Sequence, residues 1–144
     1  MALVDLFENV ALFDGLTKKE LEKVADLCIE KQFAPGEIII QQGDMGDEMY
    51  VIQEGQVEII IMGVKPERPI VILGKGQILG EMSLLDEGFR SATGRATTNT
   101  TVQMINGKKF TQLTEQDTHI GFIVMRNLAA DLSFKLRHRN LATT

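Results

Sequence analysis

Residues 79–93 read Leu79-Gly80-Glu81-Met82-Ser83-Leu84-Leu85-Asp86-Glu87-Gly88-Phe89-Arg90-Ser91-Ala92-Thr93. The stretch combines a glycine that opens a short apolar helical turn, an acidic side chain, and an arginine that follows a tight turn. Free N–H groups at a helix start bind phosphate oxygens, and glycine lets a ligand approach the backbone closely. The stretch therefore predicts a site for a small anion that also carries hydroxyl groups.

The charged side chains of this stretch suit different parts of such a ligand. The reversal at 86–88 returns Arg90 toward Gly80, and its guanidinium matches two phosphate oxygens in a way that lysine does not. Glu81 repels phosphate but accepts well from a sugar hydroxyl, while Ser83 either adds a hydroxyl or caps the turn. The competing interpretation is a surface loop in which Glu81 and Arg90 form an exposed pair worth about 0–1 kcal/mol. The succession of these residues over the whole 79–93 stretch, placed between two β segments, favours a binding site over a surface loop.

The middle of the chain has the pattern of a small all-β domain. After Pro35-Gly36, short runs rich in valine, isoleucine, tyrosine and threonine alternate with glycine-containing turns. The connections are too short for crossover helices, so the strands are expected to pair antiparallel. This predicts a jelly-roll-like antiparallel β-barrel, with strands at 37–40, 49–53, 57–62, 70–73, 90–97 and 100–105.

Helical patterns flank this β region. Thr17 and Glu20 fit a capping box, and apolar residues follow at helical spacing up to Cys28. We therefore expect residues 1–144 to form one α+β domain. It comprises an N-terminal helical segment at about 5–32, the barrel with the 79–93 stretch at about 33–106, and C-terminal helices at about 107–140.

The last helix carries an apolar seam with steps of three and four residues, formed by Phe122, Met125, Ala129, Leu132 and Leu136. The seam predicts a homodimer formed through this helix. The alternative is that the same face packs against the chain's own barrel or N-terminal helix, as in most amphipathic helices.

Composition excludes several classes of protein. With 144 residues and 44% hydrophobic content, the chain can bury a core of its own. A net charge of −5 argues against a nucleic-acid partner. The lone Cys28 is interpreted as an inert, buried thiol, and the lack of a disulfide framework, signal peptide or long apolar run favours a cytoplasmic protein without a membrane partner.

An enzyme built on a small β-barrel is the main catalytic alternative. Barrel enzymes of the cupin type need clustered histidines to hold a metal. This chain has only His119 and His138, and both lie outside the barrel region. We therefore expect no catalytic residue, no metal and no cofactor other than the bound ligand.

The 79–93 stretch resembles the phosphate-binding cassette of the cyclic-nucleotide-binding domain family. That family's pattern is roughly Gly-Glu-apolar-small-Leu-Leu, a short turn, and Arg-small-Ala-Thr, which residues 80–85 and 90–93 match. Residues 12–16, 33–39 and 43–55 are similar to the family's helical start, first strand and barrel wall. One departure is Gly94, which stands where valine is frequent and is expected to mark a bulge.

The resemblance implies roles for individual residues. Glu81 would meet the ribose 2′-hydroxyl, and Arg90 the cyclic phosphate. Ser83 stays a candidate contact, and the phosphate would also meet groups of Gly80, Met82, Ser91 and Ala92. Candidate contacts to the base are Ile70 and Ile72 on the barrel wall and Leu136 and Asn140 on the last helix.

The ligand and the output also follow from the resemblance. In the family, alanine after the arginine goes with cAMP and threonine with cGMP; Ser91 lies between, and cAMP is favoured here. The chain ends soon after the last helix, so we expect a non-catalytic regulatory module that signals through this helix to a separate effector protein, or a piece of a longer protein. The alternative is a scaffold of the same fold that no longer binds nucleotide.

Overall fold

The computed structural model describes residues 3–63, 69–85 and 88–143. Its strands form two four-stranded sheets in which all neighbouring strands pair antiparallel. The first sheet has the order β1 (Ile29–Phe33), β8 (Thr100–Ile105), β3 (Met49–Glu54), β6 (Ile78–Leu79). The second has the order β2 (Ile38–Ile40), β7 (Thr93–Ala96), β4 (Val57–Ile60), β5 (Pro69–Leu73).

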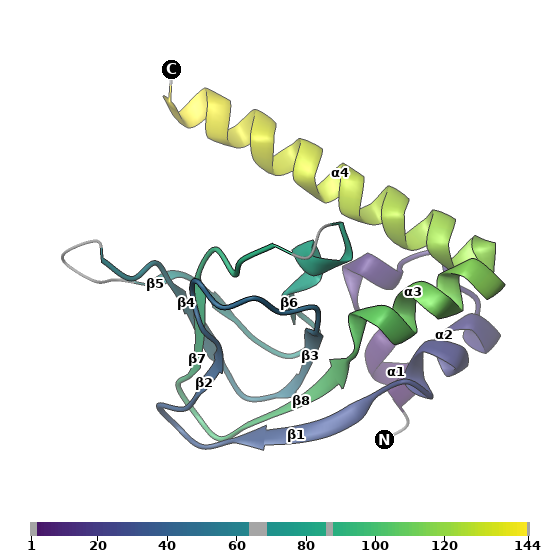
Figure 1. Cartoon of the computed structure of the whole chain (residues 1–144), viewed down its shortest axis with the longest axis horizontal. Helices are drawn as coiled ribbons and strands as arrows, with labels where there is room; N and C mark the ends of the chain where they lie inside the picture. The colour runs from purple at the N-terminus through teal and green to yellow at the C-terminus, as the bar shows by residue number, and fades with distance from the viewer. Residues whose placement is uncertain (1–2, 64–68, 86–87, 144) are drawn as a thin grey trace.

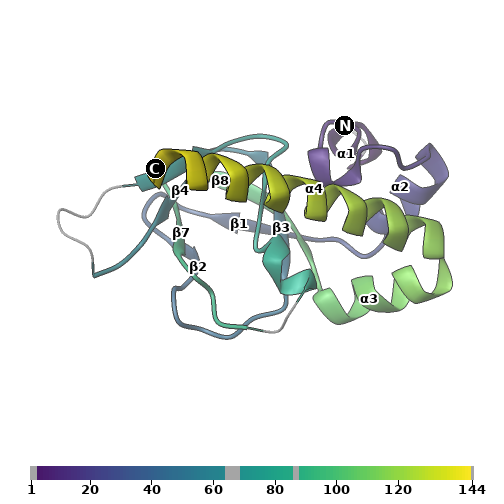
Figure 2. The same ribbon diagram turned by 90° about the horizontal axis from the view of Figure 1, so that it is seen from above.

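Most helices gather at one end of the sheets (Figure 1). They are α1 (Leu3–Phe7), the 3-10 turn η1 (Ala11–Phe13), α2 (Lys18–Ala25), α3 (Gly107–Gln116) and α4 (Thr118–Thr143). A further 3-10 turn, η2 (Glu81–Leu84), lies in the cassette. From its junction with α3, α4 runs back along the molecule toward the end that carries β4, as Figures 1 and 2 both show.

The core has two parts because strand β3 is buried on both faces. Tyr50 and Ile52 point between the two sheets, whereas Met49 and Val51 point toward the helices, as expected for side chains that alternate along a strand. The cluster between the sheets comprises Ile39, Tyr50, Ile52, Val57, Leu79 and Val102. The cluster under the helices includes Phe7, Phe13, Val24, Ile105, Phe110, Ile120, Val124 and Leu128.

The predicted antiparallel, jelly-roll-like fold with flanking helices is confirmed, as a sandwich of two sheets rather than one closed barrel. The capping box at Thr17 and Glu20 is also confirmed, with both reciprocal hydrogen bonds present. Strand β1 begins at Ile29, inside the segment predicted to be helical. This edge strand is exposed along most of its length, so its sequence lacks the alternation that marks a half-buried strand.

The face of α4 that packs inward differs from the predicted seam. Its buried residues are Ile120, Ile123, Val124 and Leu128. Of the seam, Met125 and Leu132 pack partly against the chain's own core, whereas Phe122, Ala129 and Leu136 are exposed. Intramolecular packing, the alternative interpretation, therefore accounts for part of this pattern.

Candidate functional site

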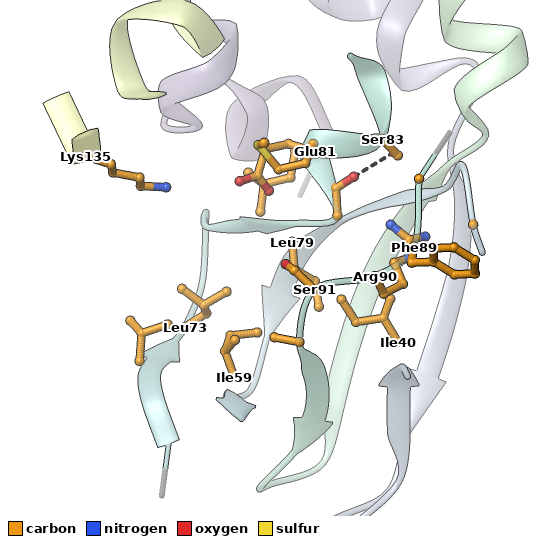
Figure 3. Close-up of a pocket in the computed structure, with 17 residues that line it drawn as sticks. Ile40, Ile59, Leu73, Leu79, Glu81, Ser83, Phe89, Arg90, Ser91 and Lys135 are labelled. Carbon is orange, nitrogen blue, oxygen red and sulfur yellow. Dashed lines mark hydrogen bonds between the residues drawn. The ribbon is translucent and has the colours of Figure 1, made fainter. Parts of the chain in front are cut away.

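A pocket of about 260 Å³ opens between the second sheet, η2 and α4. Figure 3 shows its lining side chains, which come from segments far apart in the sequence. Every cassette residue singled out from the sequence lines it: Gly80, Glu81, Met82, Ser83, Arg90, Ser91 and Ala92.

Gly80 forms the turn between β6 and η2. Its φ of 83° is in the left-handed region that glycine adopts without strain. A Cβ at this position would lie 2.8 Å from the backbone oxygen of Glu48 and 2.9 Å from Arg90 Nη1. The Ser83 hydroxyl donates back to the Gly80 carbonyl oxygen at 2.7 Å, within the turn (Figure 3).

Arg90 is held in the pocket wall by a residue that the sequence analysis did not identify. Its side chain is only 8% exposed. Its Nη2 donates to the backbone oxygen of Glu48 at 2.7 Å and lies 3.4 Å from Glu48 Oε2. The surface-loop interpretation, an exposed pair between Arg90 and Glu81, is therefore wrong.

Backbone contacts fix the Arg90 segment against the turn that precedes β3. Arg90 N donates to the Asp44 carbonyl oxygen at 2.8 Å, and Gly43 N donates to the Arg90 carbonyl oxygen at 2.9 Å. A Cβ at Gly46 would come within 2.7 Å of Arg90 Nη2, so a glycine is needed beside the guanidinium. These contacts join residues more than forty positions apart, which is why local sequence patterns did not reveal them.

Glu81, the first residue of η2, faces α4 across the pocket. Burial raises the pKa of its carboxyl above the ordinary value, and a hydrogen bond from its own backbone N–H and the charge of Lys135 partly offset that rise. Lys135 projects from α4 toward Glu81 (Figure 3), and its Nζ lies 2.8 Å from Asp131 Oδ2. The sequence did not point to Lys135, because the candidate contacts on this helix, Leu136 and Asn140, lie further along it.

The predicted base contacts on β5 lie on the wrong face of that strand. Ile70 and Ile72 do not line the pocket, whereas their neighbours Val71 and Leu73 do. Successive strand residues point to opposite faces, so an error of one position exchanges the inner and outer sets. Ile59 supplies a further apolar part of the wall.

The structure describes the side chain of only one of the two candidate base contacts on the last helix. Leu136 is 58% exposed and does not line this pocket. Asn140 lies within α4, but its side chain is outside the described residues. Asp86 and Glu87, predicted to reverse the chain before Arg90, are also outside them.

The bulge expected near Gly94 lies on the partner strand. The register between β2 and β7 shifts between Ile38 and Ile40, which face Arg95 and Gly94. A Cβ on Gly94 would lie 2.8 Å from Leu79 Cδ1 and 3.1 Å from Ile40 Cγ1. The missing side chain therefore makes room for two apolar residues that line the pocket.

A family model of the cyclic nucleotide-binding domain matches residues 30–117, more than half of the chain. This chain belongs to the cyclic nucleotide-binding domain family. Cyclic AMP receptor protein of Thermus thermophilus is 33% identical to this domain over 131 residues. The cGMP-dependent protein kinase of Plasmodium berghei is 36% identical over 86 residues, which are 60% of this chain and 10% of that protein.

The fold of the domain also resembles solved structures. The crystal structure of Thermus thermophilus catabolite activator protein superposes with a TM-score of 0.81 at 32% identity, covering 92% of this chain and 61% of that one. The chain spans 59% of the length of the Thermus cyclic AMP receptor protein, with 90% of its own residues aligned.

Other features of this cyclic nucleotide-binding domain bear on catalysis and membranes. In the part of the chain that the structure describes, no group of histidine, cysteine and acidic side chains could hold a metal ion. No helix among residues 3–63, 69–85 and 88–143 is long and apolar enough to cross a membrane. Burial raises the pKa of the Cys28 thiol to about 12, which fits the expected inert thiol.

Proposed function

We propose that this domain binds a 3′,5′-cyclic nucleotide in the 260 Å³ pocket and acts as a non-catalytic regulatory module. One observation carries the proposal: Arg90 and Glu81 line the same pocket, and Arg90 is held by Glu48 rather than neutralised by Glu81. A largely buried guanidinium is thus available to an anion, and a separate carboxylate is available to a hydroxyl.

The pocket offers a distinct surface to each part of the ligand. The guanidinium of Arg90 has five N–H donors, and Glu48 engages only its Nη2 nitrogen, so other donors can meet the exocyclic phosphate oxygens. Glu81 accepts from the ribose 2′-hydroxyl, the one hydroxyl left free in a 3′,5′-cyclic nucleotide. Val71 and Leu73 give the base an apolar wall, and Lys135 closes that side from α4.

Within this proposal, cAMP is favoured over cGMP. The similarity to a protein named for cyclic AMP extends over 90% of this chain, whereas the similarity to a cGMP-dependent kinase covers 60%. In the family, alanine at this position goes with cAMP and threonine with cGMP. Ser91 has the hydroxyl of threonine without its methyl group, so it lies between the two.

Ligand-dependent thermal stability tests the proposal. At a free concentration of about 100 Kd, a ligand that binds only the folded state stabilises it by about 2.7 kcal/mol. For a domain of this size that corresponds to a rise in Tm of roughly 5–10 °C. We expect this rise with cAMP and a smaller one with cGMP at equal concentration.

Two further ligands are controls for the proposed roles. 2′-Deoxy-cAMP lacks the hydroxyl that Glu81 would accept from, so calorimetry should show weaker binding than for cAMP, and Glu81→Gln should narrow that difference. 5′-AMP keeps the base and sugar but has an open, more highly charged phosphate, and should bind poorly. A Tm that no cyclic nucleotide raises would instead support a scaffold that has lost binding.

We also propose that α4 transmits the signal, as a homodimer or to a separate effector protein. Lys135 of α4 lines the pocket, so a ligand that contacts Lys135 is in direct contact with the helix. Phe122, Phe134 and Leu136 are exposed on α4 and are available to a partner.

Sedimentation measurements test the homodimer. The double substitution Phe134→Glu and Leu136→Glu replaces two exposed apolar side chains of α4 with charged ones. Burying these charges in a dimer interface is unfavourable, so the protein should shift toward monomer. Ile38→Glu is a matched control, since Ile38 is also exposed but lies on β2. If the unchanged protein is a monomer at all concentrations, with and without cAMP, α4 does not form a homodimer.

A further inference from the structure

Two ionic contacts tie α2 to the junction between α3 and α4. At this junction α3 ends at Gln116 and α4 begins at Thr118, with Asp117 between them. Lys23 Nζ, on α2, lies 3.0 Å from Asp117 Oδ2. Glu20 Oε2, one turn earlier on α2, lies 2.6 Å from Nδ1 of His119.

The two acidic residues also take part in capping helix ends. Glu20 is largely buried, and its other carboxylate oxygen accepts from the backbone N–H of Thr17 at 2.8 Å, which caps α2. Asp117 is the C-cap of α3, and its backbone N–H donates to the Leu113 carbonyl oxygen at 2.8 Å. Glu20 in the first turn of α2 thus contacts His119, and Lys23 in its last turn contacts Asp117. Both ends of α2 are therefore tied to the α3–α4 junction, so the direction of α4 is coupled to that of α2.

The titration of both acids is consistent with this geometry. Burial alone would raise the pKa of Glu20, but hydrogen bonds from Thr17 and His119 outweigh burial and lower it. The hydrogen bond from Lys23 is the main reason that the pKa of Asp117 is lowered. Both carboxylates are therefore anions near neutral pH and attract the cations that face them.

We propose that Glu20, Lys23, Asp117 and His119 act as positioning residues for the nucleotide pocket, forming an elbow clamp that fixes the direction in which α4 leaves α3. The buried side chains of Ile120 and Val124 hold the start of α4 on the core, and the clamp fixes its tilt. Since α4 carries Lys135 into the pocket wall, the clamp strengthens ligand binding at a distance. The ligand part of this inference rests on the proposed function.

A measurement without ligand tests the clamp. Spin labels at the exposed positions Glu22 on α2 and Arg137 on α4, in a Cys28→Ala background, report the distance between the helices. We expect a narrow distance distribution. His119→Phe keeps a ring without its nitrogens, so it removes the contact with Glu20 and should broaden the distribution. An unchanged distribution in this variant would overturn the clamp.

Calorimetry with cAMP tests the link to the pocket. We expect His119→Phe and Glu20→Gln each to weaken cAMP binding about two- to fivefold, the size of one partly exposed ionic contact. Glu20→Gln keeps the oxygen that accepts from Thr17. Neither Glu20 nor His119 lines the pocket, so the loss of affinity reports the clamp.

A matched control separates the clamp from a general loss of stability. Glu58→Gln weakens the pairing with Arg95, an ion pair between β4 and β7 away from the junction, and should leave the α2–α4 distance and the affinity for cAMP unchanged. If His119→Phe retains the affinity of the unchanged protein, the proposed link is wrong. If the unchanged protein binds neither cAMP nor cGMP, the proposed function fails, and the spin-label distances still decide the clamp.

Discussion

Replacing Arg90 with lysine is expected to weaken cAMP binding by about 2–4 kcal/mol, or one and a half to three decades in Kd. The guanidinium can donate to Glu48 through one nitrogen and to the phosphate through others. An ammonium group keeps the charge but has no planar fork, so it cannot serve both partners in this geometry. Calorimetry with cAMP measures the loss.

Arg95→Lys is the matched control for this change. Arg95 lies on β7, close to Arg90 in the sequence, but it pairs with Glu58 and does not line the pocket. The same substitution there should leave the affinity for cAMP unchanged. Near-native affinity in Arg90→Lys would show that the arginine does not bind the phosphate.

Replacing Phe110 with alanine is expected to lower the free energy of unfolding by about 3–5 kcal/mol. Phe110 of α3 is fully buried in the cluster that joins the helices to β3, including Met49 and Val124. The smaller side chain leaves a cavity that this packed cluster fills only partly. Urea denaturation, followed by circular dichroism, measures the loss.

Phe122→Ala provides the comparison on the neighbouring helix. Phe122 is 61% exposed, and its ring contacts the guanidinium of Arg126 at 5.6 Å from the ring centroid. Its loss should cost less than about 1 kcal/mol in the monomer. Equal losses for the two phenylalanines would mean that α3 and α4 do not pack as described.

The fold and the cassette could be predicted because both are encoded in local sequence. A glycine with positive φ at position 80 and the capping box of α2 involve residues close together in the chain, so spacing alone reveals them. The two strands that were missed give weak local signals: β1 is an exposed edge strand, and β6 has only two residues.

The residues missed at the site depend on tertiary packing. Glu48 contacts Arg90 across 42 positions of sequence, and Lys135 reaches the pocket only because α4 folds back along the sheets. The sequence does not separate Ile70 and Ile72 from Val71 and Leu73, because all four are apolar and an all-apolar strand has no alternation to mark its inner face.

The length of α4 makes it a lever with its pivot at Asp117. At 1.5 Å per residue, its 26 residues extend about 39 Å, and Lys135 lies about 27 Å from the pivot. A rotation about that pivot therefore moves the far end about one and a half times as far as it moves Lys135. A displacement of about 2 Å at the pocket wall becomes one of about 3 Å at the tip, where a partner could detect it without touching the pocket.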